Sequence, residues 1–152
     1  MIILSKIIGN TLSQEIVELF NKELTTIILS TVTEEGLPHA MPVHLIAAPD
    51  EKTIRMALVN AHQTTTNIKA NSKAFITVLE GQDLALGIRG TALIVKESME
   101  GNSAMCMIEF KVTEIKSDTT PTVIVTDGIR SKHRTEKTKE FFRSMFDELY
   151  KG

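Results

Sequence analysis

The sequence predicts an α+β domain in which an antiparallel β core carries one helix near each end. Two observations predict this class. β-branched segments follow one another between short turns, which leaves no room for the crossover helices of a parallel sheet. A segment near the C-terminus has the apolar spacing of an amphipathic helix. The length of 152 residues suits one domain with its own core, so a single domain over residues 1–152 is predicted.

Helices are predicted near both ends of the chain. The first covers residues 13–23, where Ser13 can act as the N-cap. Its apolar face is formed by Ile16, Val17, Leu19, Phe20 and Leu24. The last helix covers about residues 135–150 and has the clearest helical periodicity in the chain. Its apolar positions are Phe141, Phe142, Met145, Phe146, Leu149 and Tyr150.

Three strands joined by short turns are predicted after the first helix, over residues 25–33, 37–48 and 53–59. Pro38 and Pro42 cannot donate to a β ladder, so they belong at a strand start, an edge or a bulge. Consecutive strands connected by short turns form a meander. This part of the sheet is therefore predicted to be antiparallel.

The next part of the chain begins with a weak helix and continues with strands. Residues 64–70 can form a short helix, although three successive threonines disfavour it. Further strands are predicted over residues 74–79, 84–95 and 103–115. Gly87 and Gly90 interrupt the long strand and mark a bulge or the close approach of another group. Five or six antiparallel strands favour a closed or partly closed barrel, because closure removes exposed strand edges.

Composition and targeting signals exclude several classes of protein. The formal net charge is −2 and no long basic run occurs, which disfavours a nucleic-acid-binding protein. Residues 1–8 are apolar but lack the basic region and cleavage site of a signal peptide. No stretch approaches the roughly 20 apolar residues that cross a bilayer. A cytoplasmic protein with no membrane partner is expected.

The cysteine and histidines show no catalytic or metal-binding spacing. Cys106 is the only cysteine, so the chain forms no internal disulfide and no cysteine-based zinc site. It lies in an apolar run, where a buried structural thiol is expected and a reactive thiol is the alternative. The four histidines are His39, His44, His62 and His133. They match no metal motif, so no metal site is predicted and the catalytic residues stay unknown.

The segment 59–69 is the part of the sequence that says most about a possible ligand. A strand ends there, and a polar turn rich in hydroxyl groups opens a short helix. Free backbone N–H groups at a helix start, together with hydroxyls, suit a phosphate group. An ordinary capped helix with threonines facing solvent is the alternative interpretation.

Three segments, in this order, carry a resemblance to a known family. Residues 28–43 form a strand, an acidic turn ending in glycine and a strand with Pro42 followed by Val43. The run HQTTTNIKANSKA at 62–74 resembles the family segment K-T-x-x-N-L-x-x-N-P-K-V, and IRGTA at 88–92 resembles its (K/R)-G-x-A strand. The sequence thus resembles the pyridoxamine 5′-phosphate oxidase-like FMN-binding split-barrel family, and within it the small bacterial FMN-binding proteins.

The resemblance implies a fold, a cofactor and a partner. The fold would be an antiparallel six-stranded split β-barrel of Greek-key type with flanking helices. The cofactor would be FMN, bound at the interface of a homodimer. Thr64 and the N–H groups near it would hold the phosphate, and Gly90 would allow close approach. The other implied FMN-binding residues are Pro42, Val43, His44, Val59, Asn60, Ala61, His62, Gln63 and Arg89.

Gln63 departs from the family pattern because lysine is usual at this position. Loss of a charge-assisted bond to a phosphate lowers affinity by roughly ten- to hundredfold. Arg89, Lys69 or another cation would have to compensate, or FMN would bind weakly. The C-terminal arginine and histidine signature of the true oxidase is not found. The basic cluster at 130–134 is expected to be a solvated lead-in to the last helix, with a substrate-phosphate site as the alternative.

The function implied by the resemblance is that of an FMN-dependent oxidoreductase acting on a small molecule. A non-catalytic flavin-binding or electron-transfer protein is one alternative, and a split barrel that has lost FMN is another. FAD, F420 or haem could occupy the same groove. The substrate and the electron donor are left open by the sequence.

Overall fold

The computed structural model describes residues 5–152 and contains three helices and eight strands among them. The helices are α1 (Gln14–Phe20), α2 (Gln63–Ala70) and α3 (Glu136–Lys151). The strands are β1 (Lys6–Gly9), β2 (Ile27–Val32), β3 (Pro38–Val43), β4 (Ile46–Asp50), β5 (Thr53–Val59), β6 (Lys73–Glu80), β7 (Leu84–Lys96) and β8 (Met105–Ser117). Residues 1–4 of the apolar N-terminal stretch lie outside this description.

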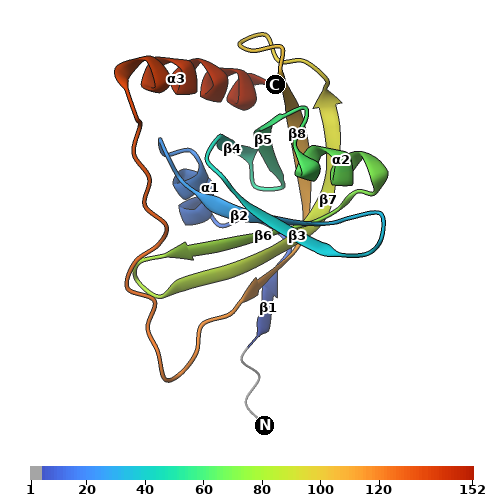
Figure 1. The fold of residues 1–152 in the computed structure, drawn as a ribbon. Helices are drawn as coiled ribbons and strands as arrows, with labels where there is room; N and C mark the ends of the chain where they lie inside the picture. The colour runs from blue at the N-terminus through green and yellow to red at the C-terminus, as the bar shows by residue number, and fades with distance from the viewer. Residues whose placement is uncertain (1–4) are drawn as a thin grey trace.

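All eight strands belong to one antiparallel sheet that curls into an open barrel (Figure 1). The strand order is β3-β2-β6-β7-β8-β5-β4, and β1 pairs with the far end of β8. The predicted α+β antiparallel split barrel is confirmed. The strands outnumber the predicted six because the segment 37–48 divides into β3 and β4, and because residues 6–9 add an edge strand to β8.

The first helix is shorter than predicted, and a side chain at its C-terminal end bonds it to the sheet in addition to its apolar packing. The hydroxyl of Ser13 accepts a hydrogen bond from the Ile16 N–H at 3.3 Å, which confirms the predicted N-cap. α1 ends at Phe20, and Asn21 is its C-cap: the Asn21 N–H still bonds back to the helix, while its side chain bonds to β4. Its amide donates to the Ala48 carbonyl and accepts from the Ala48 N–H, both at 2.8 Å.

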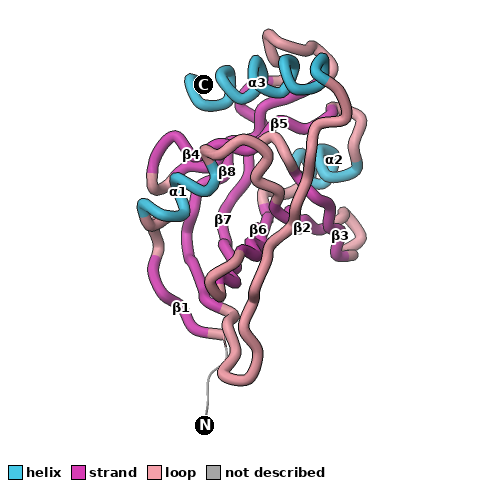
Figure 2. The backbone as a smooth tube through the Cα atoms, turned by 90° about the vertical axis from the view of Figure 1, so that its left-hand side faces the viewer, coloured by secondary structure: helices cyan, strands magenta, loops and turns pink. Residues whose placement is uncertain are grey.

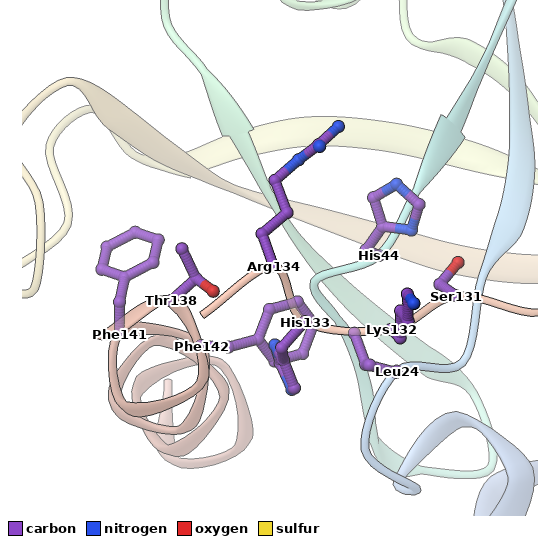
Figure 3. Close-up of a pocket in the computed structure, with 9 residues that line it drawn as sticks. All are labelled: Leu24, His44, Ser131, Lys132, His133, Arg134, Thr138, Phe141 and Phe142. Carbon is purple, nitrogen blue, oxygen red and sulfur yellow. The ribbon is translucent and has the colours of Figure 1, made fainter. Parts of the chain in front are cut away.

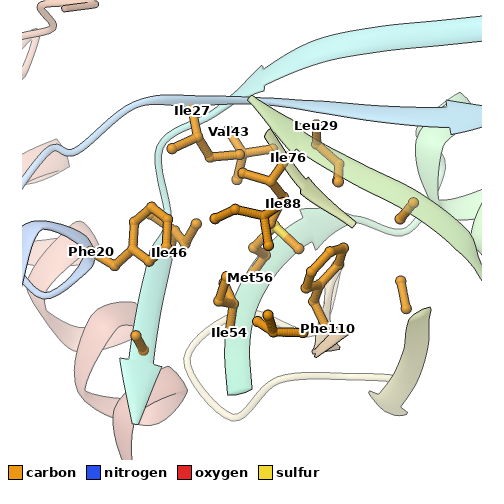
Figure 4. Packing of buried hydrophobic residues seen from close by; sticks show 14 of the residues in the cluster. Phe20, Ile27, Leu29, Val43, Ile46, Ile54, Met56, Ile76, Ile88 and Phe110 are labelled. Carbon is orange, nitrogen blue, oxygen red and sulfur yellow. The ribbon is translucent and has the colours of Figure 1, made fainter. Parts of the chain in front are cut away.

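The barrel core is made by the inward-facing side chains of the strands, and Phe20 of α1 packs at its edge (Figure 4). Its largest fully buried members include Phe110, Ile27, Leu29, Ile76, Ile88 and Met56. Cys106 is buried among them, as expected. Burial raises the pKa of its thiol, which favours the inert protonated form.

The predicted C-terminal helix is observed as α3, which covers the outer face of β4 and β5 (Figure 1). The helix packs on the barrel through a second apolar cluster, which contains Leu45, Ala47, Ala57, Met99, Met107, Met145 and Leu149. Arg55 donates to the carbonyls of Leu149 and Tyr150 at 3.1 and 3.3 Å, near the C-terminal end of the helix. The helix therefore belongs to the barrel of its own chain.

A long connection over residues 118–135, here called the strap, runs along the barrel from β8 to α3 (Figure 2). Val125 bonds in both directions with Asp83 in the β6–β7 turn, at 3.0 Å. Arg130 binds Glu80 at 2.6 Å, and Ser131 bonds to Thr26 at 2.8 Å. These contacts place the second half of the strap against the barrel. Among the helices of residues 5–152, none is long and apolar enough to cross a membrane.

Gly90 allows two neighbouring strands to pack closely. A Cβ atom at this position would overlap the Lys111 carbonyl oxygen and the Phe110 ring of β8. The register of β7 against β8 shifts between Arg89 and Gly90, so the predicted bulge is present. The expectation that Gly90 makes room for a flavin is wrong, because β8 of the same chain occupies that space.

Replacing Gly90 by alanine is expected to destabilise the protein by about 1–3 kcal/mol, because β8 would have to shift. Urea denaturation measures the change. Gly9→Ala is the matched control, since no atom lies within 4 Å of a Cβ built there. Equal stability of the two variants would contradict this account of Gly90.

Glu148 joins α3 to the β7–β8 loop. Its carboxylate accepts from the backbone N–H groups of Glu100 and Gly101, both at 2.9 Å, and from Lys96 Nζ at 3.1 Å. Burial acts to raise the pKa of Glu148, but these donors outweigh it and hold the pKa below its ordinary value of 4.5. The stabilisation is therefore fully present above that value, and it is lost as the pH falls through the lower pKa of the folded state.

Glu148→Gln is expected to lower the free energy of unfolding by about 1–3 kcal/mol at neutral pH. The deficit should shrink as the pH falls below 4.5, because the wild-type carboxylate then loses its own charge. Denaturation at a series of pH values tests this, with Glu140→Gln on the exposed face of α3 as the control. A deficit that does not change with pH would rule out the charge as its cause.

Candidate functional site

Five of the ten predicted FMN-binding residues meet in one hollow between β3, the β3–β4 junction and β5. They are Pro42, Val43, His44, Val59 and His62. The hollow, here called the apolar pocket, has a volume of about 200 Å³. Its remaining lining comes from Met41, Leu45, Ala57, Leu58, Met105 and Phe142. The lining is mostly hydrocarbon and thioether, which suits the face of a planar ring system.

The apolar pocket lies beside the start of α2, and His62 connects the two. His62 is the N-cap of α2, and its Nδ1 accepts a hydrogen bond from the Thr64 N–H at 3.1 Å. Its ring also meets the His39 ring edge-on, with centroids 5.9 Å apart. Nε2 of His39 is buried and makes no hydrogen bond within residues 5–152. This pairing could not be predicted from the sequence, because residues 39 and 62 come from different elements.

Two of the three threonines of α2 are buried and form hydrogen bonds within the protein. Thr64 is fully buried and its hydroxyl donates to Met41 Sδ at 2.9 Å, while the Thr65 hydroxyl donates to the Val59 carbonyl at 2.9 Å. Of the three threonines, only Thr66 is exposed. The interpretation that all three face solvent is therefore wrong. The predicted contact between Thr64 and a phosphate would require its hydroxyl to exchange partners.

Three more of the predicted residues lie at the turn before α2 or at its start. Asn60 is tied to the end of β8, since its N–H donates to Ala104 and its side chain to Ser103, at 2.9 and 3.3 Å. Ala61 is exposed. Gln63 is exposed, and its amide donates to Asn67 Oδ1 at 2.7 Å. These residues border the pocket without lining it.

Arg89 lies away from the apolar pocket. Its side chain projects from the outer face of β7, where it is 61% exposed and binds Glu114 at 3.0 Å. Lys69, the other cation considered for the phosphate, faces Glu97 at 3.6 Å. Both cations that could have replaced a lysine at position 63 are thus already paired with carboxylates.

A second and larger hollow adjoins the apolar pocket and shares His44 and Phe142 with it (Figure 3). This basic hollow has a volume of about 850 Å³ and lies between the β3–β4 junction, the strap and the start of α3. Its lining residues are Leu24, His44, Ser131, Lys132, His133, Arg134, Thr138, Phe141 and Phe142. The basic cluster was expected to be a solvated lead-in to the last helix, and Lys132 and Arg134 are indeed exposed, while they also border this hollow.

Hydrogen bonds hold one wall of the basic hollow in place. Thr26 Oγ1 lies 2.8 Å from both His44 Nδ1 and Ser131 Oγ. His133 Nε2 lies 2.8 Å from Glu23, and its ring packs edge-on against Phe142 at 5.2 Å. The hydrogen bond with His133 lowers the pKa of Glu23, so this carboxylate stays ionised and paired.

Comparison with known proteins places the chain in a family. The model of the pyridoxamine 5′-phosphate oxidase family matches residues 12–126. The chain belongs to this family. The match ends before Lys132, Arg134 and α3, so most of the basic hollow lies beyond it. A comparison with curated proteins gives no match.

Several solved structures share the fold of this chain. A candidate pyridoxamine 5′-phosphate oxidase from Lactobacillus delbrueckii is 21% identical, with a TM-score of 0.62 over 72% of this chain and 98% of that one. An FMN-binding protein from Syntrophomonas wolfei is 18% identical, with a TM-score of 0.54 over 67% and 85% of the two chains. The haem storage protein HutZ from Vibrio cholerae is 12% identical, with a TM-score of 0.52 over 66% and 94%.

Proposed function

We propose that this protein binds FMN and acts as an FMN-dependent oxidoreductase on a small molecule. The observation that carries the proposal is the meeting of Pro42, Val43, His44, Val59 and His62 in the apolar pocket, in a chain of this family. The S. wolfei relative, described as FMN-binding, supports the same cofactor. The flavin would supply the redox chemistry, while the protein binds and orients it.

The two ends of the proposed site fit FMN unequally. The pocket offers an apolar wall from Pro42, Val43 and Val59 for a flavin ring. At the other end, the start of α2 offers a positive helix dipole to a phosphate but no lysine, because residue 63 is glutamine. We therefore expect the ring to contribute more to binding than the phosphate does.

We also propose that the protein works as a homodimer in which the second copy completes the flavin site. Small-molecule sites usually enclose about 300–1,000 Å³, which is more than the 200 Å³ of the apolar pocket. Val59 is 50% exposed and Pro42 is exposed at its border. A surface of the partner against these residues would enclose the flavin.

A second candidate is a split barrel that holds another ligand, such as haem, in the same groove. Gln63 and the engaged hydroxyl of Thr64 favour it, because both weaken the phosphate side of an FMN site. The haem storage protein HutZ shares this fold. A non-catalytic flavin-binding or electron-transfer protein is the remaining alternative. The absorbance spectrum of the purified protein separates flavin from haem, and reduction of bound flavin by a nicotinamide cofactor separates an enzyme from a carrier.

Gln63→Lys is expected to tighten FMN binding by about tenfold, because the new ammonium group adds a charge-assisted bond to the phosphate. Fluorescence titration with FMN and with riboflavin measures the effect. Riboflavin lacks the phosphate, so its affinity should not change.

The matched control for this substitution is Gln14→Lys, which adds the same charge at the start of α1. If neither the wild-type protein nor the Gln63→Lys variant binds FMN or riboflavin, although both are folded, the flavin proposal fails. If riboflavin affinity rises as much as FMN affinity, residue 63 does not face the phosphate.

Analytical ultracentrifugation of the wild-type protein is expected to give a molecular mass twice that of the 16.9 kDa chain. Val59→Glu should weaken the dimer and FMN binding together, since it places a charge in the proposed interface. Ile124→Glu in the strap, where the side chain is 69% exposed, is the control. A monomeric wild-type protein with full FMN affinity would exclude a shared site.

A further inference from the structure

The proposed flavin site has no cation at the end where a phosphate would lie. Within residues 5–152, none of the residues that line the apolar pocket is Lys, Arg, Asp or Glu. Residue 63, at the start of α2, is glutamine. Lys69 lies in the last turn of α2 and faces Glu97 at 3.6 Å. Lys132 and Arg134 border the adjoining basic hollow and do not line this pocket.

The hydrogen-bond donors at the start of α2 are engaged within the chain. The Thr64 N–H donates to His62 Nδ1 at 3.1 Å, and the Thr64 hydroxyl donates to Met41 Sδ at 2.9 Å. The Gln63 amide donates to Asn67 Oδ1 at 2.7 Å. Thr64 is fully buried and does not line the pocket. To bind a phosphate, its two groups would have to give up their present partners, and such an exchange adds little affinity.

The attraction that remains for a phosphate is the dipole of α2. A helix start raises the affinity for an anion by only about two- to fivefold. A charge-assisted bond from a lysine or an arginine raises it by roughly ten- to hundredfold. The net charge of −2 gives the chain no overall attraction for an anion. The phosphate of FMN therefore gains little at this end of the site.

The other end of the site fits a flavin ring whether or not a phosphate is attached. Pro42, Val43 and Val59 supply an apolar wall, and His44 and His62 supply ring nitrogen atoms. A flavin ring has carbonyl and nitrogen acceptors that an imidazole N–H can meet. Riboflavin and FMN have the same ring, so this end of the site does not distinguish between them.

We propose that this site selects a flavin by its ring alone and binds riboflavin, the form without a phosphate, as tightly as FMN. The inference rests on the proposed flavin function and names the class of ligand that the same site accepts, which includes uncharged flavins. The selectivity follows from two features of the start of α2. Residue 63 provides no cation, and the groups of Thr64 are bonded to His62 and Met41.

Fluorescence titration of the wild-type protein with riboflavin and with FMN tests the proposal. The two dissociation constants should agree within about fivefold, which is the difference that the helix dipole allows. Raising the salt concentration from about 0.05 to about 0.5 M should affect the two ligands alike, because no ion pair forms with the phosphate. Gln63→Lys is the positive control, since it should shift the ratio of the two constants by about tenfold in favour of FMN.

Thr64→Val tests the buried hydroxyl separately. This variant should leave the ratio of the two dissociation constants unchanged, because the hydroxyl is bonded to Met41 and does not face the pocket. Thr66→Val is the matched control, because it removes a hydroxyl from the exposed threonine of the same helix. Circular dichroism shows whether both variants are folded, and the wild-type ratio and its salt dependence do not depend on either variant.

Two results would overturn ring selection. The first is FMN binding that is at least ten times tighter than riboflavin binding to the wild-type protein and that weakens with salt. The second is a folded Thr64→Val protein that loses affinity for FMN but not for riboflavin, because its hydroxyl would then contact the phosphate. In both cases the flavin function would stand. If the folded wild-type protein binds neither ligand, the flavin function itself is refuted.

Discussion

The two-residue junction between β3 and β4 is the constraint on which the rest of the structure depends. It carries the chain from one edge of the curled sheet to the other, so the two edge strands are neighbours in sequence. Leu45 turns inward beneath α3, and His44 stays exposed and bonds to Thr26. This junction thereby brings the two edges of the open barrel near each other, provides Leu45 for the packing of the last helix and places His44 between the two hollows.

Much of this architecture could be predicted from local patterns, and the exceptions have physical reasons. The periodicity of α3, the cap at Ser13 and the strand-forming segments are properties of short stretches. The division of residues 37–48 was missed, since the apolar run at 45–48 continues the strand pattern and gives no sign of a corner. The short strand β1 was missed because it forms only by pairing with β8, far along the chain.

The candidate site was predictable only in part, for the same reason. Family resemblance grouped Pro42, Val43 and Val59, and the structure brings these residues together in one pocket, since they lie on strands whose register the barrel sets. The resemblance also assigned Arg89 to the flavin site, but the Arg89 side chain points outward, away from that pocket, and binds Glu114. Nor could a sequence motif reveal that Thr64 bonds to Met41, because that contact needs β3 and α2 to be packed together.

The strap shows how a segment that lies mostly outside the family match is fixed onto a common fold. A cluster of basic residues before a helix is usually solvated, and an exposed charge there costs little. Here the strap is fixed by its contacts with Thr26, Glu23 and Glu80, which pair its other groups and leave Lys132 and Arg134 over a recess. The strap therefore owes its position to ion pairs and hydrogen bonds with distant parts of the barrel, and the sequence of the strap alone could not reveal these contacts.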